Sequence, residues 1–224
     1  MEGWTTNPKE AIELQKKLRD EVRLVPLQHP PTLVGGCDVS MNRFAISGFA
    51  GFVTLTYPAL ELVDHAVVED DIPMPYIPGL LSFREIPMLV KAWEQLATKP
   101  DVIVVDGIGI AHPRRLGIAS HLGLVLNVPT IGCAKSVLTG VYEEPANVPG
   151  ATASLVDKKT GEVIGMALRT KRNVKPVFVS PGHLITLEEA VQLVHHSVRS
   201  YRLPEETRLA HNTVNEYRIR ASAS

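Results

Sequence analysis

The sequence lacks several features that would each define a class of protein. It has no run of about 18 apolar residues, so we expect no membrane-spanning helix. The N-terminus has no apolar segment of the signal-peptide type. The formal net charge is only −1, which argues against a protein that binds nucleic acid through bulk positive charge. We therefore expect neither a membrane protein, nor a secreted protein, nor a strongly basic nucleic-acid binder.

Cysteine is scarce as well. The two cysteines, Cys37 and Cys133, lie in apolar, strand-like runs and do not form a pair with metal-ligand spacing. We interpret them as buried thiols in a reducing cytoplasm rather than as a disulfide. Hydrophobic residues make up 45% of the chain and charged residues 21%, which is typical of a globular protein with a sizeable core. The length of 224 residues suits a single domain over residues 1–224, which we expect to act as a monomer.

The charges that are present are unevenly distributed. Residues 169–175 carry four positive side chains and no acid, whereas residues 61–71 carry five acids. A local basic strip on a nearly neutral protein fits an enzyme that contacts a few phosphates. It fits a solvated hairpin face equally well, so the charge distribution alone leaves both interpretations open.

The first half of the chain predicts a helix, an antiparallel meander, a second helix and a buried strand. Asn7, Pro8 and Glu10 form a helix start, and the apolar stripe that follows runs as far as Val22 before prolines end the helix. Short turns separate three strand-like runs, which favours antiparallel neighbours. The predicted strands span residues 32–40, 43–57 and 61–68, followed by a helix over 81–96 and a buried strand over 101–107.

The second half predicts two more elements of the sheet and a C-terminal extension. A helix over residues 115–126 and a strand over 130–134 complete the order β-β-β-α-β-α-β. A hairpin (151–157 and 162–170), a strand (176–179), a helix from the Thr186 and Glu189 capping box to about residue 201, and a last helix near 204–205 follow. We predict an α/β fold with a mixed five-stranded sheet, three antiparallel strands and then parallel ones, flanking helices, and an extra C-terminal hairpin and helices.

Three acids fall at informative places in this scheme. Asp38 lies near the end of the first strand, Glu85 begins the first long helix, and Asp106 ends the buried strand before Gly107. If the first and fourth strands are neighbours, Asp38 and Asp106 meet at one edge of the sheet. Converging carboxylates need a cation, and oxygen-only ligands favour Mg²⁺ or, in substitution, Mn²⁺. Aspartates also cap turns at strand ends, which is the simpler explanation for each acid taken singly.

Two loops carry further candidate residues. The segment over residues 106–124 combines glycines, two histidines and two arginines but does not satisfy G-x-G-x-x-G, so it is no dinucleotide fingerprint. His112 and Arg114-Arg115 could form a phosphate-binding turn or an ordinary helix start with surface arginines. In the other loop, Tyr76 stands between two prolines that stiffen the backbone. The ring is either a lid on the core or is held out to meet a partner.

The motifs together resemble the endonuclease V family of DNA repair nucleases. They are G-G-C-D-V-S (35–40), P-Y-I-P-G-L-L-S-F-R-E (75–85), the long motif from Asp106 (106–123), G-C-A-K-S (132–136), V-S-P-G-H (179–183) and T-R-L-A-H (207–211). The resemblance runs from about Asp38 to His211. It implies a ribonuclease H-like core and Mg²⁺-dependent nicking of DNA at the second phosphodiester on the 3′ side of deoxyinosine.

The resemblance also implies roles for individual residues. Asp38, Glu85 and Asp106 match the acids of the family, Lys135 its active-site lysine, and His211 a supporting histidine near the metal. The proline-flanked loop would act as a wedge beside the extruded base. The predicted nucleic-acid contacts are Tyr76, Pro75, Pro78, Gly79, Leu80, Leu81, Gly107, Gly109, His112 and Arg114.

Three alternatives to this function stay open. The substrate could be inosine in RNA, or branched or mismatched DNA, because no residue decides how the 2′-hydroxyl is treated. A catalytically silent nucleic-acid-binding module of the same fold would be expected to lose one or more acids, and all three are present.

Overall fold

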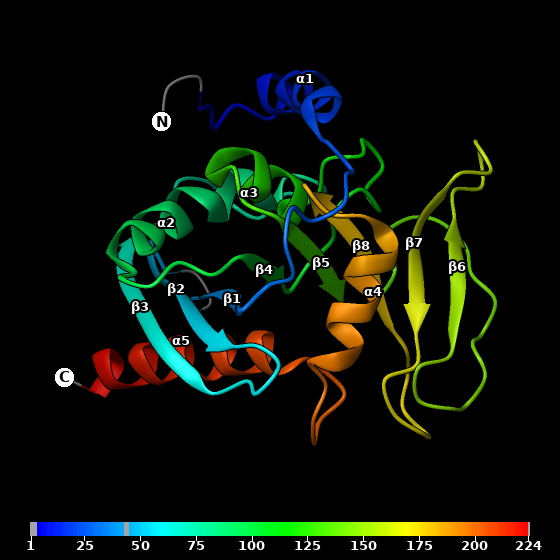
Figure 1. The fold of residues 1–224 in the computed structure, drawn as a ribbon. Coiled ribbons are helices and arrows are strands. Elements are labelled where there is room, and N and C mark those ends of the chain that lie inside the picture. The colour runs from blue at the N-terminus through cyan, green and yellow to red at the C-terminus, as the bar shows by residue number, and fades with distance from the viewer. Residues whose placement is uncertain (1–3, 43–44, 224) are drawn as a thin grey trace.

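The computed structural model describes residues 4–42 and 45–223, and in this range a single mixed sheet runs through the molecule (Figure 1). The predicted start of the second strand at Arg43 lies outside the described residues. The strand order is β3-β2-β1-β4-β5-β8-β7-β6. The strands are β1 (Leu33–Ser40), β2 (Ser47–Thr56), β3 (Leu62–Asp71), β4 (Val102–Val105), β5 (Thr130–Ala134), β6 (Thr152–Val156), β7 (Val163–Leu168) and β8 (Val177–His183).

The first five strands confirm the predicted topology. β1 pairs with β2, and β2 with β3, in antiparallel fashion, whereas β1, β4 and β5 are parallel neighbours. The β1–β4 register places Cys37 opposite Val105. The strands that end in the two predicted metal-binding aspartates are therefore adjacent.

The C-terminal strands extend this sheet rather than forming a separate hairpin beside it. β8 adds to β5 in antiparallel orientation, β7 adds to β8, and β6 forms the far edge. β8 continues to His183, four residues beyond the predicted end, because its second half still pairs with β5. The predicted five-strand core is thus one part of an eight-stranded sheet.

Helices cover both faces of the sheet (Figure 1). Side chains of α2 and α3 share one core cluster with β1 and β4, and those of α4 share another with the opposite face of the same strands. α5 packs mainly on β1 and β2. The helices are α1 (Pro8–Leu18), α2 (Leu81–Gln95), α3 (Ile118–Leu126), α4 (Leu187–His196) and α5 (Glu205–Ala223), with a short 3₁₀ turn at Arg19–Glu21.

Three helix boundaries differ clearly from the prediction. α1 ends at Leu18 instead of Val22, because the chain continues as the 3₁₀ turn. The other two differences also have local causes. α3 begins at Ile118 instead of Arg115, because Arg115 has a positive φ of 59° and Gly117 is the N-cap residue. α4 ends at His196 instead of near residue 201, because the chain turns there and Val198 forms a β-bridge with Pro204. Among the described helices, none combines the length and apolar character needed to cross a membrane.

Strand alternation decides which way the site residues point. Cys37 and Val105 belong to the cluster under α2 and α3, whereas Val104 belongs to the cluster on the other face. A Cβ at Gly36 would lie 2.1 Å from the carbonyl oxygen of Glu206 in α5. Because successive side chains alternate, the residues after Cys37 and Val105 point to the α5 side of the sheet.

Candidate active site

Asp38 and Asp106 lie at neighbouring strand ends, and each has a cationic or imidazole partner. His211 on α5 donates from Nδ1 to Oδ2 of Asp38 at 2.9 Å. Lys135, the first residue after β5, forms a short ion pair with Oδ2 of Asp106. Both aspartates are half-buried, whereas the lysine and histidine side chains are about half exposed. Asp38, Asp106, Lys135 and His211 thus meet at the C-terminal ends of two neighbouring central strands, which we call the charged edge.

Glu85 completes a group of three carboxylates that repel one another. Burial, together with the negative charges of Asp38 and Asp106 and against the opposing effect of Arg84, raises the pKa of Glu85 to about 8. Burial also raises the pKa of Asp38, which the hydrogen bond and charge of His211 partly offset. The three carboxyl groups therefore do not all ionise readily beside one another without a cation.

The chemistry of these acids suits a hard divalent cation. All three donors are carboxylate oxygens, the ligands that Mg²⁺ prefers, and a bound cation would relieve their mutual repulsion. Over residues 4–42 and 45–223, however, no group of three or more His, Cys, Asp or Glu side chains converges as a ready metal site. The acids fit the ion in donor type and charge, and their ligation of it stays a prediction.

Two residues that the motif analysis missed hold the charged partners in place. Arg202 donates to the backbone carbonyls of Lys135 at 3.0 Å, Lys175 at 2.7 Å and Pro176 at 2.6 Å. Asn215, one turn after His211, donates from Nδ2 to His211 Nε2 at 3.0 Å. Neither residue lies in a motif that indicates such a role.

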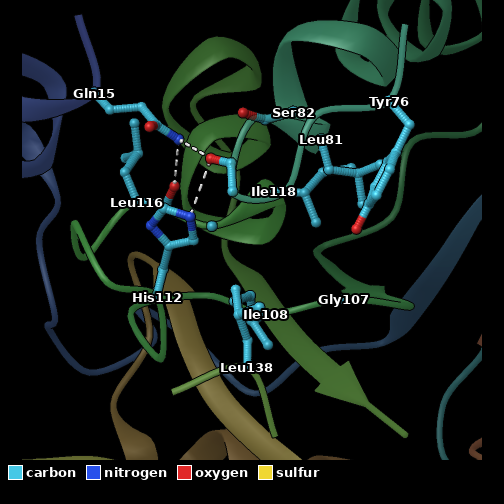
Figure 2. Close-up of a pocket in the computed structure, with 12 residues that line it drawn as sticks. Gln15, Tyr76, Leu81, Ser82, Gly107, Ile108, His112, Leu116, Ile118 and Leu138 are labelled. Atoms are coloured by element: carbon cyan, nitrogen blue, oxygen red, sulfur yellow. Dashed lines mark hydrogen bonds between the residues drawn. The ribbon is translucent and has the colours of Figure 1, made fainter. Parts of the chain in front are cut away.

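An apolar pocket of about 160 Å³ adjoins the acids on the α2 and α3 side of the sheet (Figure 2). Gly107, which directly follows Asp106, is part of its lining. The other lining residues are Gln15, Tyr76, Gly79, Leu81, Ser82, Ile108, His112, Leu116, Gly117, Ile118 and Leu138. One of the three acids, Asp106, is consequently bonded directly to a residue that lines the pocket.

The carbonyl of Gly79 anchors the wall of this pocket. It accepts hydrogen bonds from Gln15 Nε2 at 3.0 Å, His112 Nε2 at 3.1 Å and Arg114 at 2.8 Å. Gly79 has a φ of 80°, a conformation that a side chain would strain. Gln15 also donates to the carbonyl of Leu116 at 3.2 Å and accepts from Arg114 Nε at 2.5 Å. This buried glutamine, one turn after Ala11, was not predicted.

His112 is a neutral part of this anchor. Burial, helped by the charges of Arg114 and Arg115, lowers the pKa of His112 to about 4. The backbone N–H of Arg114 donates to Nδ1 at 3.1 Å, so the ring proton resides on Nε2. A neutral, buried imidazole supports a backbone carbonyl here and adds no positive charge for a phosphate.

The predicted phosphate-binding turn is engaged within the protein. The Arg114 guanidinium bonds to Gln15 and Gly79, as above, and Arg115 pairs with Asp157 at 2.7 Å and Glu162 at 2.9 Å. Gly109 packs inside the molecule, where a Cβ would lie 2.0 Å from the carbonyl oxygen of Pro181. These contacts favour the structural interpretation of the turn, which links α1, the Gly79 loop and the β6–β7 hairpin.

The proline-flanked loop presents its tyrosine to the surface. Tyr76 is 59% exposed and lies at the rim of the pocket (Figure 2). Pro75 and Pro78, on either side of it in the loop, are also exposed. Leu81 is part of the pocket wall, but the side chain of Leu80 is buried in a core cluster with Ala11, Met74 and Phe83. Of the two leucines predicted to contact the nucleic acid, only Leu81 lies in the pocket.

The fold and the site define a class: an α/β protein whose sheet carries carboxylates at neighbouring strand ends beside an apolar pocket. The Endonuclease V family model matches residues 16–212. The chain belongs to the Endonuclease V family.

Endonuclease V proteins from several bacteria are similar in sequence to most of this chain. Endonuclease V of Gloeobacter violaceus is 50% identical over 93% of this chain and 85% of its own length, and that of Myxococcus xanthus is 47% identical over 92% and 87%. The crystal structure of Endonuclease V from Streptomyces avermitilis, 40% identical, superposes with a TM-score of 0.92 over 98% of this chain and 96% of that one.

A further solved structure includes nucleic acid. Endonuclease V of Ciona intestinalis, in complex with a 24mer DNA containing an inosine followed by a ribo-adenosine, is 28% identical to this chain. It superposes with a TM-score of 0.83 over 95% of this chain and 98% of that one.

Proposed function

We propose that this protein is a DNA repair endonuclease that recognises deoxyinosine and hydrolyses the second phosphodiester bond on its 3′ side, with Mg²⁺ or, in substitution, Mn²⁺. The observation that carries the proposal is the continuity of Asp106 and Gly107, which joins the carboxylates to the apolar pocket. Binding of inosine-containing DNA by the Ciona intestinalis relative supports the same substrate class.

The pocket suits a base that has been taken out of the helical stack. Enzymes that inspect one base in a duplex extrude it, at a cost of a few kcal/mol. The walls made by Leu81, Ile108 and Ile118 offer apolar contact to a flat heterocycle, and the peptide groups of the glycines allow close approach. Tyr76, exposed at the rim, would fill the vacated place in the stack.

The charged edge suits hydrolysis of a phosphodiester. Asp38, Glu85 and Asp106 would hold the cation, which when bound supplies charge stabilisation at the phosphoryl oxygens and lowers the pKa of a water molecule. Lys135 can place its ammonium group against the scissile phosphate or the attacking water, because its side chain is about half exposed and its backbone is fixed by Arg202. His211 would orient Asp38 through its hydrogen bond.

The test is cleavage of synthetic oligonucleotides with and without divalent cations. A duplex with a single deoxyinosine, the same duplex without it, and an inosine-containing RNA would each be incubated with Mg²⁺, Mn²⁺ or EDTA, and the products mapped to the nucleotide. We expect metal-dependent cleavage of the deoxyinosine strand at the second bond on the 3′ side. Cleavage of RNA alone would reassign the substrate, and binding without cleavage under any metal would indicate a silent module.

A further inference from the structure

Tyr76 at the rim of the pocket has a counterpart, a second exposed aromatic residue that lies outside the pocket. Tyr201 is 59% exposed, as Tyr76 is, and stands in the loop between α4 and α5. The guanidinium carbon of Arg208 lies 4.9 Å from the centre of its ring. Arg208 is held in turn by Glu205, with NH2 to Oε2 at 2.5 Å. The ring and the guanidinium therefore form a stack whose geometry is fixed before any ligand arrives.

The loop with Tyr201 is pinned to a basic turn. Lys171 Nζ donates to the carbonyl of Ser200 at 2.5 Å, and Thr170 Oγ1 donates to the carbonyl of Arg202 at 2.9 Å. The bridge between Val198 and Pro204 closes the base of the loop. An exposed side chain on a pinned loop loses little entropy when it binds.

The turn and the loop share one sign of charge. Residues 169–175 contain four basic residues and residues 197–202 contain two, and neither segment has an acid. Arg169 is buried and paired with Glu144, whereas Arg172, Lys175 and Arg199 are exposed. The basic strip, which the sequence could not distinguish from a solvated hairpin face, thus contacts the loop that carries an exposed aromatic side chain.

This surface is continuous with the catalytic groups. Arg202 bonds to the backbone of Lys135 and to that of Lys175, so one side chain joins the two regions. Arg208 precedes His211 by three residues, which places both on one side of α5. The pocket, by contrast, is built from α2, α3 and the Gly79 loop on the opposite face.

We infer that the Tyr201–Arg208 stack, together with Arg172 and Lys175, binds the sugar-phosphate strand of the nucleic acid as it leaves the scissile phosphate on the α5 side. This inference rests on the proposed function, since it takes the substrate to be a nucleic acid. Basic side chains match phosphates, and an aromatic face stacks on any base or sugar, so the contact adds affinity without reading sequence. Together Tyr76 and Tyr201 would hold the strand on both sides of the cleavage site.

The experiment measures binding of a deoxyinosine duplex in Ca²⁺, to prevent turnover, by fluorescence anisotropy. Tyr201→Ala is expected to raise the dissociation constant about tenfold, within the range of one lost stacking contact, whereas Tyr201→Phe keeps the affinity. Arg172→Ala with Lys175→Ala should reduce the salt dependence by about one unit of log–log slope per lost phosphate contact. Tyr217→Ala, an exposed tyrosine farther along α5 that contacts His65, is the matched control.

Duplexes shortened stepwise on either side of the lesion sharpen the test. The loss of affinity caused by Tyr201→Ala should disappear when the duplex arm that extends toward the Tyr201–Arg208 stack is removed. The shortened strand then no longer reaches the stack. Equal affinity of Tyr201→Ala and wild type for the longest duplex, with unchanged melting temperatures, would overturn the inference while leaving the proposed function intact.

The same measurements separate this inference from the proposed function. If the wild-type protein does not prefer deoxyinosine, the proposed function fails, and binding of an undamaged duplex then decides the role of this surface. A tenfold loss for Tyr201→Ala on that duplex would support the surface as a nucleic-acid contact. A loss of equal size for Tyr217→Ala would contradict it.

Discussion

The pocket side and the α5 side of the sheet meet at the ends of β1 and β4, but they use different chemistry. On the pocket side, apolar side chains surround hydrogen bonds to the Gly79 carbonyl, and burial lowers the pKa values of both His112 and His121 to about 4. On the α5 side, Asp38, Asp106 and Glu205 are each paired with a cationic or imidazole side chain.

This difference suits the two tasks that the proposed function assigns to the two sides. A flat, uncharged base is best held by a dry surface with fixed backbone groups, because burying an unpaired charge there would be costly. A phosphodiester in hydrolysis gains charge, which fixed ionic groups stabilise. Substitutions of the charged groups at the strand ends should therefore affect catalysis, whereas substitutions on the pocket side should affect binding and selectivity.

The largest effect is expected for Asp106→Asn. The substitution removes one charge from the carboxylate set and breaks the ion pair with Lys135. Cleavage of the deoxyinosine duplex in Mg²⁺ should fall by more than the roughly 10- to 100-fold lost with an outer-shell partner, while binding stays measurable. Asp20→Asn, a change at an exposed aspartate of the α1 end, is the control. Cleavage near the wild-type rate would contradict a role for Asp106 at the cation.

Lys135→Ala should come next, with a loss of about 2–4 kcal/mol in the activation free energy. The expected loss lies in the single-turnover rate, because the ammonium group acts on charge that develops during hydrolysis. Lys17→Ala, an exposed lysine on α1, should leave the rate unchanged. If the variant lost affinity alone, Lys135 would be only a phosphate contact.

The α5 side also predicts a pH dependence of stability. Burial raises the pKa of Glu206 from an ordinary value of about 4.5 to about 8, and Glu205 adds to the effect. Between these values the unfolded chain loses the proton and the folded protein keeps it, so the free energy of unfolding falls as pH rises. In Glu206→Gln, the free energy of unfolding should therefore decrease less as pH rises, by roughly 1–3 kcal/mol.

Chemical denaturation in metal-free buffer at pH 5 and pH 8 measures the difference. Glu85, whose pKa is also raised to about 8, contributes in the same window in both proteins. The comparison therefore isolates Glu206. An identical pH dependence for wild type and Glu206→Gln would show that Glu206 ionises in the folded state.

On the pocket side, Gln15→Ala tests whether the anchor controls selectivity. The carbonyl of Leu116 and the Nε of Arg114 each lose a partner, which should lower the free energy of unfolding by about 1–3 kcal/mol. The preference for deoxyinosine over undamaged duplex should also narrow, whereas exposed Gln28→Ala should change neither property. Retained selectivity in a destabilised protein would limit Gln15 to a structural role.

The smallest change is expected for Tyr76→Ala. Loss of the rim tyrosine should weaken binding of the deoxyinosine duplex by roughly 1–2 kcal/mol, in the range of one stacking contact. The melting temperature should hardly move, because Tyr76 is 59% exposed. Unchanged affinity together with a melting temperature lowered by many degrees would identify Tyr76 as a core residue instead.

The sequence predicted those parts of the site that depend on local pattern and strand order. The β-branched run before Asp106 predicted a buried strand, and the short turns predicted an antiparallel meander. From the sequence alone, the meeting of Asp38 and Asp106 is conditional on adjacent first and fourth strands, and the register of β1 and β4 shows that these strands are adjacent. The prolines around Tyr76 left two possibilities, a lid or an exposed ring, and the structure shows the ring exposed.

What the sequence by itself determined about this protein was its topology, its acidic edge and its family, because periodicity and motif spacing are properties of short segments. Only the tertiary structure decided which polar groups meet. Gln15 reaches Gly79 and Leu116, respectively 64 and 101 residues away, and Arg202 reaches Lys135, 67 residues away. Such partners are chosen by packing at hydrogen-bond distances, which no local pattern encodes.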